Sequence, residues 1–132
     1  PHHKTEKERP FAEAPFGITG LETSVCLTMT ELVKTGVLTP MQMVEKMSYN
    51  PAKIIGIDKG TLLPGKVADV TIIDPDDEYV IDSERFASMG KNTPFNGKKV
   101  TGRVRYTMVN GRVVYSYRDG SECIIDKDVP KL

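Results

Sequence analysis

Apolar residues recur at helical spacing from position 21 onward. They fall three or four residues apart, on one face of a helix, as Leu21, Val25, Met29, Leu32 and Val33. Gly36 follows this run and suits the C′ position, where a left-handed backbone ends a helix. The pattern therefore predicts a helix over residues 21–34.

A second helical pattern starts with a capping signal. Thr39 suits the N-cap and Pro40 suits the first helical position. The apolar face that follows consists of Met43, Val44 and Met47. The pair Asn50-Pro51 then predicts a separate short helical turn that runs through Ile55.

After Gly56 the apolar period changes to two, which is typical of strands. Residues 68–74 alternate and follow a predicted type II turn at Pro64-Gly65, and residues 78–81 predict a short second strand. The clearest element is a β-hairpin around Asn110-Gly111, a dipeptide that favours a type I′ turn. Its alternating residues are Val104, Tyr106 and Met108 before the turn and Val113, Tyr115 and Tyr117 after it.

The two ends of the chain carry no regular pattern. Prolines at positions 1, 10 and 15 predict a long loop over the first 19 residues, and loops of this length are often functional. The charged tail from Arg118 onward is expected to fray. Helices thus precede strands, with a boundary near Gly56–Gly60.

The amino-acid composition argues against two classes of binding partner. The 132 residues carry 18 basic and 18 acidic side chains, so the chain has no electrostatic footprint for nucleic acid or for an anionic membrane. No apolar run approaches the roughly 18 residues of a membrane span, and we expect a cytoplasmic location. The distant pair Cys26 and Cys123 favours reduced thiols over a disulfide.

The residues alone do not predict an active site. His2 and His3 are adjacent, and adjacent residues of an extended chain point to opposite faces, so the two cannot easily bind one metal. Asp69 and Asp74 lack a spacing suited to acid–base catalysis, and no P-loop, dinucleotide fingerprint or Ser-His-Asp order occurs. We therefore expect no catalytic residue and no metal ligand set within this chain.

Four segments together resemble the closing part of a dihydroorotase of the amidohydrolase superfamily. They are PHH, FAEAPFGITGLET, NPAKIIGIDKGTLLPGKVADVTIID and GKNTPFNGKKVTGRVRYTMVNGRVVY, and they extend from Pro1 to about Tyr117. The third segment is shared widely within the superfamily. APFG-GLET and GKNTPF-G are more specific, and they are similar to dihydroorotases rather than to hydantoinase-like relatives.

The resemblance implies an α/β fold. Such proteins contain a (β/α)8 TIM barrel and a small β-sandwich built from both chain ends. Residues 1–56 would be the end of the barrel, with the substrate loop and the last helices, and residues 57–132 would be a sandwich segment. The family binds Zn²⁺ through ligands expected outside this chain, and its catalytic aspartate would lie three residues upstream of Pro1.

The resemblance also implies a reaction and its substrate contacts. Dihydroorotases interconvert N-carbamoyl-L-aspartate and (S)-dihydroorotate in pyrimidine biosynthesis. By position, His2 would contact the substrate carboxylate, and Phe16 and Gly17 would belong to the loop that covers the substrate. We expect a fragment that is inactive alone and needs the preceding polypeptide, in an enzyme that can form a homodimer. A non-catalytic paralogue or subunit, and a hydantoinase-like cyclic amidohydrolase, remain alternatives.

Overall fold

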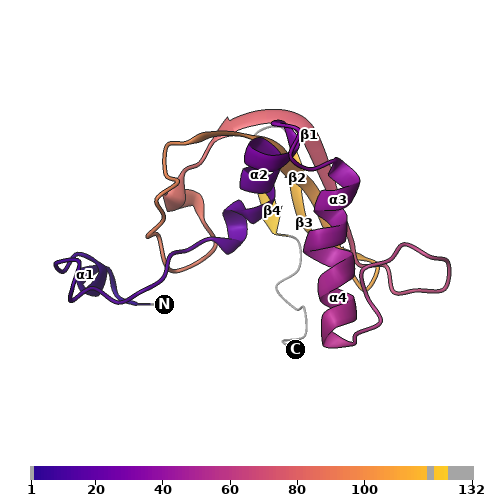
Figure 1. Ribbon diagram of the computed structural model, residues 1–132, viewed down its shortest axis with the longest axis horizontal. Coiled ribbons are helices and arrows are strands. Elements are labelled where there is room, and N and C mark those ends of the chain that lie inside the picture. The colour runs from indigo at the N-terminus through magenta and orange to yellow at the C-terminus, as the bar shows by residue number, and fades with distance from the viewer. Residues whose placement is uncertain (1, 119–120, 125–132) are drawn as a thin grey trace.

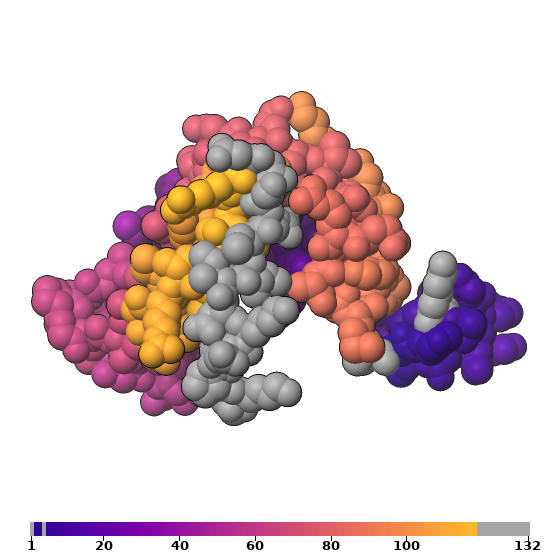
Figure 2. All heavy atoms as spheres, turned by 180° about the vertical axis from the view of Figure 1, so that it is seen from behind, coloured from indigo at the N-terminus to yellow at the C-terminus, as the bar shows by residue number. Residues whose placement is uncertain are grey.

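The structure is a computed structural model that describes residues 2–118 and 121–124. Four antiparallel strands form one sheet in the order β1-β2-β3-β4, and α2 packs against β2, while α3 and α4 form a second helical run beside it (Figure 1). The N-terminal segment projects sideways from this body and forms a separate lobe in the space-filling view (Figure 2). The strands are β1 (Val70–Val80), β2 (Lys99–Val109), β3 (Arg112–Arg118) and β4 (Ser121–Ile124).

The first predicted helix is confirmed as a continuous helical run. A 3-10 turn (Leu21–Thr23) leads into α2 (Ser24–Thr28), and a π-helical turn (Met29–Val33) follows. Gly36 has a φ of +79° just beyond the run, as expected of a left-handed helix end. Cys26 and Met29 form the buried side of the run.

The second helical pattern is also confirmed, but it is not interrupted. Thr39 accepts a hydrogen bond from the Gln42 N–H at 3.2 Å, and the Gln42 side chain accepts one from the Thr39 N–H at 2.8 Å, which completes a capping box. The helical run comprises α3 (Pro40–Val44), a π-helical turn (Glu45–Tyr49) and α4 (Asn50–Ile55).

The predicted break before Asn50-Pro51 is therefore wrong. A proline inside an α-helix lacks the amide donor and its ring collides with the carbonyl four residues earlier. The π-helical turn directly before Pro51 has a wider ring of hydrogen bonds, and the chain passes the proline without ending the helix. The run ends at Gly56, whose φ is +72°.

The two strands predicted at residues 68–74 and 78–81 are instead one bulged strand, β1. It pairs with β2 through Asp74↔Arg103 and then through Glu78↔Thr101, so residues 75–77 face the single residue Gly102. Pro75 cannot donate to the sheet, and its place in this bulge leaves the pairing on both sides intact. The predicted alternation holds after the bulge, where Tyr79 is more buried than Glu78 and Val80. It fails before the bulge, because Ile72 is 46% exposed and the register also shifts between Ile72 and Ile73.

The predicted hairpin is confirmed. Asn110 and Gly111 have φ values of +51° and +75°, as a type I′ turn requires, and Val109 pairs with Arg112 across it. Part of the tail that we expected to fray forms β4, which pairs with β3. Residues 119–120 and 125–132 of that tail lie outside the described residues.

Two further expectations need correction or completion. The first 19 residues do not form a loop throughout, because a short helix, α1 (Lys4–Lys7), lies within them. Cys26 is a buried free thiol, and the side chain of Cys123 lies outside the described part of the chain. No helix in the described part of the chain is long and apolar enough to cross a membrane.

The core lies where the first helical run meets the sheet. Cys26, Ile81 and Val100 form its centre, and their packed neighbours are Leu27, Tyr79, Phe86 and Phe95. Thr30 accepts a hydrogen bond from the Thr101 N–H at 2.9 Å, which attaches the helical run to β2.

Candidate substrate-contact segment

The three predicted contact residues lie in the N-terminal lobe, on two pieces of chain that Lys7 joins. The Lys7 ammonium donates to the carbonyl oxygens of Pro15 at 2.7 Å, Phe16 at 3.1 Å and Gly17 at 2.7 Å. Lys7 is the last residue of α1, a one-turn helix that begins shortly after His2. His2 and the pair Phe16-Gly17 therefore belong to one folded unit. The described chain contains no direct interaction between His2 and either residue of this pair.

His2 lies exposed at the start of this unit. Its Nδ1 is 3.6 Å from the Glu6 carboxylate, and that carboxylate also accepts a hydrogen bond from the His3 N–H at 2.9 Å. The His3 hydrogen bond is the main reason that the pKa of Glu6 lies below its usual value. His3 is also exposed, and its Nδ1 lies 2.8 Å from the Thr5 hydroxyl.

Phe16 and Gly17 occupy the tip of the returning chain. Phe16 is 95% exposed. Gly17 has a φ of +96°, which favours glycine, and a β-carbon placed there would meet no atom within 4 Å. The space next to the Gly17 α-carbon is therefore not filled by other atoms of the described chain.

A segment distant in sequence holds the base of this tip. The Asn92 side chain donates to the Gly17 carbonyl at 3.0 Å, and the Asn92 carbonyl accepts from the Thr19 N–H at 2.9 Å. Gly90 lies so close that a β-carbon there would be 2.8 Å from the Thr19 hydroxyl. The segments APFG-GLET and GKNTPF-G thus contact each other directly.

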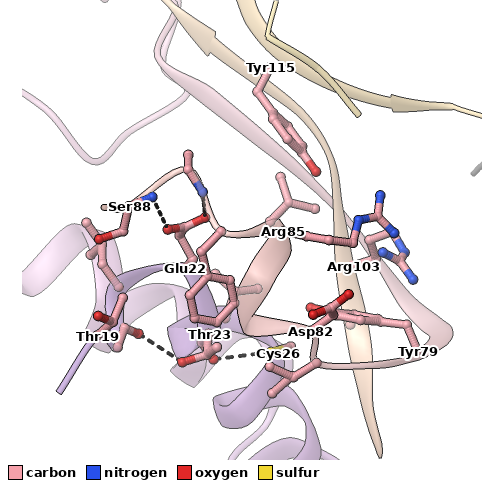
Figure 3. A pocket seen from close by; sticks show the side chains of 18 of the residues that line it. Thr19, Glu22, Thr23, Cys26, Tyr79, Asp82, Arg85, Ser88, Arg103 and Tyr115 are labelled. Atoms are coloured by element: carbon pink, nitrogen blue, oxygen red, sulfur yellow. Dashed lines mark hydrogen bonds between the residues drawn. The ribbon is translucent and has the colours of Figure 1, made fainter. Parts of the chain in front are cut away.

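Glu22 connects APFG-GLET to the residues just before GKNTPF-G. Its carboxylate accepts hydrogen bonds from the Ala87 N–H at 2.9 Å and the Ser88 N–H at 3.0 Å (Figure 3). Sequence reasoning missed the roles of Lys7, Glu22 and Asn92. The only available signal was that Glu22 and Asn92 belong to the two most specific motifs, and no signal pointed to Lys7.

A hollow of about 1170 Å³ opens between α2, β1, β2 and the 82–88 loop. Cys26, Tyr79 and Arg103 line it, and the Cys26 thiol donates to the Thr23 carbonyl at 3.2 Å (Figure 3). Burial, followed by the hydrogen bond with Cys26, raises the pKa of Tyr79 far above its usual value. Tyr79 therefore keeps its proton, and the Arg103 guanidinium lies 3.8 Å over its ring. Neither Tyr79 nor Arg103 therefore provides an activated nucleophile.

Among the side chains that the structure describes, no group of three or more from His, Cys, Asp and Glu could hold a metal ion, so these side chains do not fit a zinc centre.

Comparison with known proteins defines the class. A model of the amidohydrolase family matches residues 12–114. The chain therefore belongs to the amidohydrolase family, and the motifs that surround Gly17 and Asn92 lie inside the matched region.

Curated relatives carry a more particular name. The chain is 55% identical over 118 residues to a dihydroorotase of Pelotomaculum thermopropionicum, and the match covers 89% of this chain and 28% of the relative. It is 53% identical over 115 residues to a dihydroorotase of Geobacter metallireducens, covering 87% of this chain and 27% of the relative. The chain thus spans little more than a quarter of the length of these relatives.

Solved structures support the fold. An L-hydantoinase (dihydropyrimidinase) from Arthrobacter aurescens is 43% identical and superposes with a TM-score of 0.74 over 78% of this chain and 23% of that chain. A D-hydantoinase from a Bacillus species is 28% identical, with a TM-score of 0.74 over 80% of this chain and 24% of that chain. The helices packed on an antiparallel sheet are an amidohydrolase-type arrangement.

Proposed function

We propose that this chain is the closing part of a dihydroorotase, which interconverts N-carbamoyl-L-aspartate and (S)-dihydroorotate in pyrimidine biosynthesis. The observation that carries the proposal is the contact between APFG-GLET and GKNTPF-G. These are the dihydroorotase-like motifs, and Asn92 joins them at Gly17. Identities of 47–55% to curated dihydroorotases over most of the chain support the same reading.

In this proposal, residues 1–56 close the TIM barrel and residues 57–132 belong to the β-sandwich. Zn²⁺ is bound by polypeptide outside this chain, where it supplies Lewis-acid chemistry. The chain's partners are that polypeptide and, in a homodimer, a second copy. The chain alone is inactive, and the complete enzyme works in the cytoplasm.

The residues of this chain bind and enclose the substrate. His2 donates a hydrogen bond to the substrate carboxylate, since its ring is exposed and its neighbour His3 is occupied with Thr5. The open side of Gly17 lets the backbone approach the substrate closely. Phe16, which is exposed here, covers the ring of the substrate and excludes water.

The test uses the full-length protein and two matched substitutions. His2→Ala is expected to raise the KM for dihydroorotate by about 10- to 100-fold, the cost of a hydrogen bond to a charged group. It should leave turnover of dihydrouracil, which lacks the carboxylate, nearly unchanged. His3→Ala is the control and should change neither KM by more than about twofold. Wild-type protein without activity on dihydroorotate would refute the proposal.

A hydantoinase-like activity is the second candidate, because a 43% identical L-hydantoinase shares the fold. Under that alternative, the wild-type protein turns over hydantoins or dihydrouracil faster than dihydroorotate. His2→Ala then has the same small effect on every substrate.

A further inference from the structure

Lys7 is a half-buried side chain of the N-terminal lobe, and all of its donors have partners. An ammonium has three donors, and here all three point to successive carbonyl oxygens, those of Pro15, Phe16 and Gly17. Hydrogen bonds from a charged donor are stronger than neutral ones. One side chain therefore determines the orientation of three consecutive peptide units.

This orientation has a consequence for the opposite side of the chain. In a trans peptide unit the N–H points away from the C=O, and the described chain contains no cis peptide bond. The amides of Phe16, Gly17 and Ile18 therefore point away from Lys7. No hydrogen bond from these three amides occurs within the described residues. These amides are therefore available to donate to a ligand on the side of the loop opposite Lys7.

The backbone of Lys7 connects this site to His2. The Lys7 N–H donates to the His3 carbonyl at 3.3 Å, and the Glu6 carboxylate holds the His3 N–H and lies beside His2. The helix α1 thus links His2 to the loop that contains Phe16 and Gly17.

We propose that Lys7 is a positioning residue, which holds the amides of residues 16–18 outward and at a fixed place relative to His2, so that both contact one carboxylate-bearing substrate. The proposal rests on the proposed function for the identity of that substrate. The effect of Lys7 on the conformation of the loop does not depend on that identity, and hydrogen exchange measures it directly.

The experiment compares Lys7→Met with the wild-type full-length protein. Hydrogen–deuterium exchange followed by mass spectrometry reports on the peptide that spans residues 15–19. We expect about tenfold faster exchange of the Thr19 amide in Lys7→Met, because this amide donates to the Asn92 carbonyl and its place depends on the loop that Lys7 holds. Exchange in residues 98–109 should not change, since Lys7 lies outside the core. Lys46→Met is the control, because Lys46 is an exposed helical lysine with no interaction found in the described chain.

Kinetics supply the functional readout. The KM of Lys7→Met for dihydroorotate should rise about tenfold while kcat changes less than about threefold, since misplaced binding groups weaken substrate binding most. Unchanged exchange at residues 15–19 would overturn the proposal, as would faster exchange with an unchanged KM. If the wild-type protein does not act on dihydroorotate, the proposed function fails, and the exchange comparison still decides whether Lys7 holds the loop.

Discussion

Gly102 is the residue at which the first helical run approaches the sheet most closely. It lies opposite the bulge of β1 with a φ of +90°, and a β-carbon there would be 2.6 Å from Cγ of Met29. Two separate effects therefore require glycine at this position. One is the backbone conformation and the other is the space taken by Met29.

Gly102→Ala is expected to destabilise the protein by about 2–4 kcal/mol, the sum of overpacking and of a strained left-handed backbone. Gly65→Ala separates the two effects, because Gly65 has a φ of +84° with no atom within 4 Å of a β-carbon. It should cost only about 1 kcal/mol. Urea unfolding of both variants measures the difference, and equal losses would show that Met29 does not constrain Gly102.

The bulge of β1 is held by charged residues of β2. Asp77 accepts a hydrogen bond from Arg103 at 2.8 Å and forms an ion pair with Arg105 at 2.9 Å, and the side chains of Asp77 and Arg103 are only 17% and 13% exposed. Arg103 also lies over the rings of Tyr79 and Tyr117. Arg105 bonds Asp74 as well, which keeps the pKa of that carboxyl below its usual value.

Neighbouring aspartates in the bulge offer a matched pair of substitutions. Asp77→Asn leaves a largely buried guanidinium without its charge partner, and we expect a loss of about 2–3 kcal/mol in the free energy of unfolding. Asp76 pairs with Lys34 but is 82% exposed, so Asp76→Asn should cost less than about 1 kcal/mol. Thermal unfolding ranks the two variants, and a larger loss at Asp76 would contradict this account.

Local signals identified most of the elements, and non-local packing decided where they join. The Thr39 capping box and the Asn110-Gly111 turn depend on neighbouring residues, so both could be predicted. The β1 bulge depends on Gly102 and Asp77 meeting across two strands, which no local pattern reveals. Lys7 was missed for the same reason, since its partners are carbonyl groups, which every residue carries. His2, Phe16 and Gly17 came from family resemblance, and their roles in binding stay predictions.

At the scale of the whole molecule, many large apolar side chains of the described chain are exposed. The second helical run and the loop after it carry Met41, Ile54, Leu62 and Leu63, which are 75%, 83%, 80% and 64% exposed. Large exposed apolar patches drive association. In the proposed enzyme this face packs on the preceding polypeptide, since the chain spans little more than a quarter of its curated relatives.

The 132-residue chain, expressed alone, is therefore expected to self-associate, with a mass in light scattering that rises with concentration. Replacing both Ile54 and Leu62 by Ser should lower that mass, because each side chain is at least 80% exposed and contributes little to the core. Phe11→Ser is the control, since Phe11 is 97% exposed but lies in the N-terminal lobe. A wild-type chain that remains a monomer at all concentrations would show that this face needs no cover. A reduction by Phe11→Ser equal to that of the double variant would place the association in the lobe, away from the face that we assign to the barrel.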